Sequence, residues 1–93
     1  MIAFIILHYK NIKDTLECIE SILKQETDKK VKIIVVDNNT LNEKDEQKLK
    51  KYNIDLIKLE KNKGFAKANN IGCKFAIKNY KPDYLIVSNN DII

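Results

Sequence analysis

Two short apolar runs constrain the fold of this chain more than any other feature. They cover residues 2–7 and 31–36; the first is rich in isoleucine, and the second in isoleucine and valine. Runs of this length and composition are typical of strands that are buried on both faces, which occur mainly in parallel sheets. Helical patterns separate them from each other and from two further strand-like segments. We therefore predict an α/β fold in which helices cover a parallel sheet.

The remaining elements follow from apolar spacing and capping signals, in the order β-α-β-α-β-α-β. Asn11 is expected to cap the first helix, and Gly64 to begin the last. The segment at 54–59 alternates in polarity and predicts an edge strand. The predicted strands cover residues 2–7, 31–36, 54–59 and 84–87, and the predicted helices about 11–24, 43–52 and 64–79. Five apolar residues of the last helix are expected to face the sheet: Phe65, Ala68, Ile71, Phe75 and Ala76.

Size and composition exclude several classes of protein. With 93 residues, 44% apolar and 32% charged, the chain has room for one small domain. The net charge of +4 is scattered over lysines, so nucleic-acid binding is not expected. Cys18 and Cys73 have no metal-binding spacing and predict a reduced, cytoplasmic protein. The first apolar run is too short to span a membrane and lacks the charged start of a signal peptide.

The segment at 62–72 breaks the rules of helix composition. Asn69, Asn70 and Gly72 lie inside the predicted helix, although asparagine is a mediocre helix former. Glycine in a helix interior costs about 1 kcal/mol relative to alanine. A segment that gives up helix propensity in this way usually gains a close backbone approach or a polar contact.

Polar side chains collect where the predicted strands end. His8 and Tyr9 follow the first strand, and the Asn62–Gly64 turn precedes the last helix. Because ligands of open α/β sheets bind beyond the carboxyl ends of the strands, these groups predict a nucleotide site. Tyr9 is placed to stack on a base, and the helix start to favour phosphate. The polar groups after the second and fourth strands are Asp37, Asn38, Asn39, Asn89, Asn90 and Asp91.

Each of these residues also has a structural interpretation. Aspartate and asparagine at strand ends are common turn formers, and Tyr9 can equally plug the edge of the sheet. His8 is assigned no catalytic role. The chain has neither a GxGxxG fingerprint nor a P-loop, which leaves a mononucleotide diphosphate held partly by a divalent cation. Asp91 supplies the oxygen ligands that Mg²⁺ or Mn²⁺ prefers. Two alternatives remain: a non-catalytic nucleotide-binding module and an α/β domain used only for interaction.

Three ordered motifs carry a resemblance to a known family. Residues 35–40, 62–72 and 83–91 resemble the N-terminal half of family 2 glycosyltransferases, most closely the rhamnosyltransferase-like branch. The resemblance implies a three-layer α/β/α, Rossmann-like GT-A fold with strand order 3-2-1-4. It also implies transfer of a sugar, with inversion, from a UDP-, dTDP- or GDP-linked donor to a hydroxyl of a saccharide or lipid-linked acceptor. Mg²⁺ or Mn²⁺ is the implied cofactor.

The resemblance implies roles for individual residues. Tyr9 matches the tyrosine that contacts the base, Asp37 and Asn38 match the pair that contacts the nucleoside, and Asp91 matches the metal-binding carboxylate. The implied nucleotide-sugar-binding residues are Tyr9, Asp37, Asn38, Asn62, Gly64, Asn69, Asn70 and Asn90.

The chain departs from the family pattern at several positions. Asn89 stands where the family has the first acid of its DxD motif, so weaker metal affinity is expected. Leu7 and Lys10 replace the usual residues around the tyrosine. The general base and the acceptor site are expected beyond Ile93, so the chain reads as the donor-binding half, residues 1–93, inactive alone. We expect it in the cytoplasm or at the inner face of the membrane, and expect its last strand to self-associate.

Overall fold

Four parallel strands form one sheet in the computed structural model, which describes residues 1–25 and 28–89. They are β1 (Ile2–His8), β2 (Val31–Asp37), β3 (Asp55–Lys58) and β4 (Tyr84–Asn89). Their order is β3-β2-β1-β4, and each neighbouring pair is parallel. This confirms the predicted α/β, Rossmann-like fold with strand order 3-2-1-4, and places β3 at an edge as predicted.

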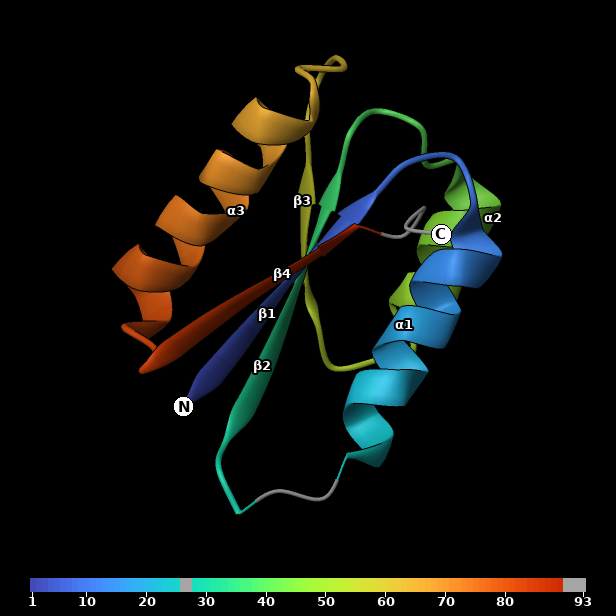
Figure 1. The fold of residues 1–93 in the computed structure, drawn as a ribbon. Coiled ribbons are helices and arrows are strands. Elements are labelled where there is room, and N and C mark those ends of the chain that lie inside the picture. Colours follow the sequence, from blue (N-terminus) through green and yellow to red (C-terminus); the bar gives the residue numbers. More distant parts are fainter. Residues whose placement is uncertain (26–27, 90–93) are drawn as a thin grey trace.

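Three helices complete the layers. Helices α1 (Ile12–Lys24) and α2 (Glu43–Leu49) cover one face of the sheet, and α3 (Phe65–Tyr80) covers the other (Figure 1). Asn11 caps α1 as predicted, since its side chain accepts hydrogen bonds from the backbone N–H groups of Lys13 and Asp14. Helix α2 is shorter than predicted because the chain tightens into a turn after it, where the Tyr52 N–H donates to the Leu49 carbonyl at 3.1 Å.

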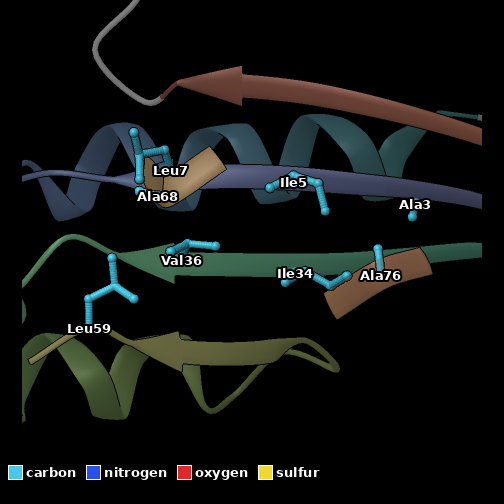
Figure 2. Packing of buried hydrophobic residues seen from close by; sticks show 8 residues of the cluster. All are labelled: Ala3, Ile5, Leu7, Ile34, Val36, Leu59, Ala68 and Ala76. Carbon is cyan, nitrogen blue, oxygen red and sulfur yellow. The ribbon is translucent and has the colours of Figure 1, made fainter. Parts of the chain in front are cut away.

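Side chains of β1 and β2 alternate between two hydrophobic layers. Odd-numbered residues of β1 and even-numbered residues of β2 face α3, together with Leu59 (Figure 2). The other positions of both strands pack against α1 and α2. Nearly every residue of β1 and β2 is therefore buried, because helices cover both faces of these strands.

Small residues let α3 lie close to the sheet. Ala68, Gly72 and Ala76 are its buried positions. A Cβ atom at Gly72 would lie 2.6 Å from Cγ2 of Ile5 and 2.9 Å from Cγ2 of Val36. The expected close backbone approach is therefore present at Gly72. The prediction that Phe65 packs on the sheet is wrong: its side chain is 45% exposed, because it begins the helix one turn before the first buried alanine.

Cys18 and Cys73 are free thiols, each half-buried. Within residues 1–25 and 28–89, no helix combines the length and the apolar composition needed to cross a membrane.

Strand β4 is apolar and largely exposed. Its residues Tyr84, Leu85, Ile86 and Val87 are between 36% and 57% exposed. It pairs with β1 on one side and is the last strand of the sheet in the part of the chain that the structure describes. An apolar edge strand without charge or proline is a template for pairing with another strand.

We therefore expect the chain to self-associate at high concentration. Sedimentation velocity across a concentration series should show a growing dimer or oligomer fraction. Val87→Lys should abolish it, because a charge on an edge strand opposes pairing. Leu23→Lys is the matched control, since Leu23 is also a large exposed apolar residue but lies on α1. A monomer at all concentrations, or equal effects of both lysines, would contradict the prediction.

Candidate functional site

The ends of the strands align at one edge of the sheet, here called the carboxyl edge. His8 at the end of β1 is in register with Asp37 at the end of β2, and Leu7 is in register with Asn89 of β4. The start of α3 lies at the same edge (Figure 1). The predicted convergence of polar segments is therefore present for three of the four. Asn90 and Asp91 lie outside the described residues.

A pocket of about 310 Å³ opens at the carboxyl edge. It is lined by Tyr9, Asn38, Asn62, Gly64 and Phe65. Its volume is at the lower end of the range for small-molecule sites. Four of these five residues were predicted from the sequence as nucleotide-site residues, and they come from three separate segments of the chain. Phe65 was missed, although its place directly after the helix-opening Gly64 is a signal that puts it at this end of α3.

Two amide side chains shape the turn that leads into α3. Asn38 Oδ1 accepts a hydrogen bond from the backbone N–H of Lys63 at 3.0 Å, and Asn62 Oδ1 accepts one from the N–H of Gly64 at 2.8 Å. Asn38 is 1% exposed, so this bond is an internal tie between the end of β2 and the turn.

Gly64 occupies a backbone conformation that other residues rarely adopt. Its φ is 81° and its ψ is 162°, a region that is essentially restricted to glycine. A Cβ atom there would meet no atom within 4 Å, so the space beside it is open. Glycine is therefore required at this position by backbone geometry rather than by packing.

The carboxylate of Asp37 organises the loop after β2. Oδ1 accepts hydrogen bonds from the N–H groups of Thr40 at 2.9 Å and Leu41 at 3.2 Å. The Thr40 hydroxyl in turn accepts a bond from the N–H of Lys10 at 2.8 Å. Asp37 is only 2% exposed and does not line the pocket. Through Thr40, it ties together the loops that follow β2 and β1.

Tyr9 and Phe65 both line the pocket and contact each other there. Their ring centroids are 6.1 Å apart and the ring planes stand at 87°, an edge-to-face arrangement. The ammonium group of Lys10 lies 5.0 Å from the centroid of the Tyr9 ring. The pocket thus has two aromatic side chains in its lining, and a positive charge lies over the ring of one of them, Tyr9.

The two adjacent amides of α3 lie in different environments. The side-chain oxygen Oδ1 of Asn69 is buried and has no hydrogen-bond partner among the described residues, whereas Asn70 is exposed. Neither residue lines the pocket. A buried polar atom without a partner requires an explanation, and a ligand or a further segment of protein would provide one.

His8, the last residue of β1, is fully buried. Its Nδ1 shares a hydrogen bond of 2.6 Å with the Thr15 hydroxyl of α1. Burial lowers the pKa of His8 below its ordinary value of 6.5, and the negative charges of Asp37 and Asp45 oppose this shift. The imidazole is therefore held by a hydrogen bond in the interior of the fold.

This burial predicts a pH dependence of stability. Because the folded chain binds the His8 proton less readily than the unfolded chain, stability should fall as pH drops below about 6.5. Thermal unfolding between pH 7.0 and 5.5 measures the effect. His8 is the only histidine, so His8→Gln should lower the melting temperature but flatten its dependence in this window. An unchanged slope in His8→Gln would contradict the assignment.

The described residues contain no cluster of side chains that would bind a metal ion. Across residues 1–25 and 28–89, no three side chains of His, Cys, Asp or Glu lie together in a group that would hold a metal ion. The predicted ligand Asp91 falls outside these ranges.

Comparison with known proteins identifies the family. The sequence model of Glycosyl transferase family 2 matches residues 3–93, nearly the whole chain. A search of curated proteins found no match. The family match agrees with the parallel sheet, with its strand order and with the motifs that line the pocket at its carboxyl edge. The chain therefore belongs to glycosyltransferase family 2.

Proposed function

We propose that the chain is the donor-binding half of an inverting glycosyltransferase and holds a nucleotide diphospho-sugar in the pocket at the carboxyl edge. One observation carries the proposal most: four predicted nucleotide-site residues from three segments line a single pocket. The pocket lies where open α/β sheets bind ligands. The family match supplies the reaction class, transfer of a sugar to an acceptor.

In this proposal the base stacks on the ring of Tyr9. Asn38 and Asn62 border the same space, and the Oδ1 atoms of both already accept backbone hydrogen bonds. The group of each asparagine that remains available to a ligand is chiefly its NH₂ group, which donates hydrogen bonds. Acceptor atoms of the base or of the ribose are therefore the groups that these two amides bind.

The diphosphate is proposed to lie near the start of α3. Helices α1 and α2 are capped by asparagine side chains and carry acidic residues in their first turns. Helix α3 has neither a side-chain cap nor an acidic first turn. Its first N–H groups and its dipole therefore favour an anion. The exposed Lys10 and Lys63 add positive charge in the adjoining segments.

The cofactor proposal rests on Asp91 and on the family resemblance. A carboxylate suits Mg²⁺ or Mn²⁺, and a metal bound at a diphosphate neutralises the charge that develops on the leaving group. The residues of the pocket would bind and orient the nucleotide. The rhamnosyltransferase-like branch, a saccharide or lipid-linked acceptor and a cytoplasmic location are also proposals. They rest on the motifs and, for the location, on the two free cysteines.

Nucleotide titration tests the proposal. UDP, dTDP and GDP are added to the ¹⁵N-labelled chain with Mn²⁺ for affinity, and with Mg²⁺ for amide chemical shifts. We expect shifts at Tyr9, Asn62 and Gly64. Asp91→Asn should remove the metal-dependent part of the affinity, because an amide keeps the shape but loses the charge. Shifts that are absent, or confined to the opposite edge of the sheet, would contradict nucleotide binding, and an unchanged affinity in Asp91→Asn would contradict the metal ligand.

A further inference from the structure

Phe65 is a large aromatic side chain that does not pack in the hydrophobic core. It is 45% exposed, whereas the fully buried residues of α3 are small. Burying an aromatic ring is strongly favourable, and Phe65, unlike the exposed Ile77 of the same helix, lies where a ligand in the pocket would cover it. Part of its exposed surface lines the pocket at the carboxyl edge.

The geometry of the two rings makes a corner. The planes of Phe65 and Tyr9 stand at 87°, with centroids 6.1 Å apart, and the rings come from different elements. A planar base that stacks on Tyr9 meets the Phe65 ring at about a right angle. Perpendicular and offset stacked contacts are the two arrangements that aromatic rings prefer. The corner therefore offers a base one favourable contact of each kind.

We propose that Phe65 is a second base-binding residue. Its ring would contact one edge of a base stacked on Tyr9, limit the size of the base on that side, and so contribute to base specificity. This inference rests on the proposed function. It assigns Phe65 a contact with the base only, because the diphosphate is expected at the backbone N–H groups of α3 rather than at the ring.

The test compares a ligand that has a base with one that lacks it. The probes are the tightest-binding of UDP, dTDP and GDP, and inorganic pyrophosphate, each with Mg²⁺. Phe65→Ala should weaken nucleotide binding about tenfold and leave pyrophosphate binding unchanged, and Phe65→Tyr should retain the nucleotide affinity. Ile77→Ala is the matched control, since Ile77 is an exposed apolar residue farther along the same helix.

A second measurement guards against indirect effects. Nuclear Overhauser contacts between protons of the base and the Phe65 ring should appear in the complex with the parent chain. Equal losses for nucleotide and pyrophosphate in Phe65→Ala, or no such contacts, would overturn the inference while nucleotide binding by the parent still stands. No nucleotide binding by the parent chain would overturn both the inference and the proposed function.

Discussion

Gly72→Leu is expected to prevent the chain from folding, and Gly72→Ala to destabilise it even though alanine is the better helix former. A Cβ atom at this position would lie under 3 Å from methyl groups of both Ile5 and Val36. Both side chains are buried, β-branched and therefore stiff. Overpacking a core costs about 1–3 kcal/mol, which exceeds the gain in helix propensity of about 1 kcal/mol. At about 0.05–0.15 kcal/mol per residue, a 93-residue chain has a stability of roughly 5–14 kcal/mol, so alanine should weaken the fold without abolishing it. Leucine places three more carbon atoms in a space that is too small for one, so its cost should approach the lower end of that stability.

Chemical denaturation measures the effect of Gly72→Ala, and circular dichroism shows whether Gly72→Leu folds. Lys74→Ala is the matched control, because Lys74 is exposed on the same helix and should change stability by less than about 0.5 kcal/mol. A Gly72→Ala variant that is more stable than the parent would show that α3 moves away from the sheet at little cost.

Asp37→Ala is expected to lower the free energy of unfolding by about 3 kcal/mol and to abolish nucleotide binding. The substitution leaves the N–H groups of Thr40 and Leu41 without their acceptor, and hydrogen bonds to charged groups contribute about 1.5–3 kcal/mol each. It also releases Thr40, which holds the N–H of Lys10 beside Tyr9. The base-stacking wall of the pocket should therefore lose its fixed position.

Asp37→Asn separates the two roles that this residue can have. An amide oxygen can still accept from Thr40 and Leu41, so the loss of stability should be much smaller than in Asp37→Ala. If Asp37 acts through the loop, nucleotide binding should survive in Asp37→Asn. Loss of binding in a well-folded Asp37→Asn would instead indicate that the carboxylate contacts the nucleoside directly, as the family resemblance implies. Parent-like stability of Asp37→Ala would contradict the structural role.

Local patterns were sufficient to predict the strands, the helices and the α/β class of this chain. The continuous apolar run at 2–7 is typical of a strand that is buried on both faces, and such a strand needs helices on both sides of its sheet. The cap at Asn11 was predicted because capping depends on residues within one turn. The cost of glycine inside a helix likewise predicted a close approach, although the partners Ile5 and Val36 were not predicted. The strand order came from the family motifs and not from periodicity.

The meeting of several predicted residues at one pocket also followed from the sequence. Parallel strands place their carboxyl ends at the same edge, so residues that follow different strands become neighbours. Tyr9, Asn38 and Gly64 were predicted on this ground, and they line the pocket together. The prediction required only the directions of the strands, not the positions of side chains.

Only the tertiary structure decided what each polar group does at this edge. The side-chain oxygen of Asn38 accepts a hydrogen bond from the N–H of Lys63, a residue 25 positions away. The carboxylate of Asp37 accepts one from the N–H of Thr40, in the loop that follows it. Phe65 turns toward Tyr9 instead of toward the sheet. Periodicity assigns a residue to a face of its helix or strand, but it does not show whether the sheet extends far enough to cover a residue at the end of that helix, such as Phe65. Hydrogen-bond partners depend on which distant segments meet, and this is set by the packing of α3 on β1 and β2 rather than by any local pattern.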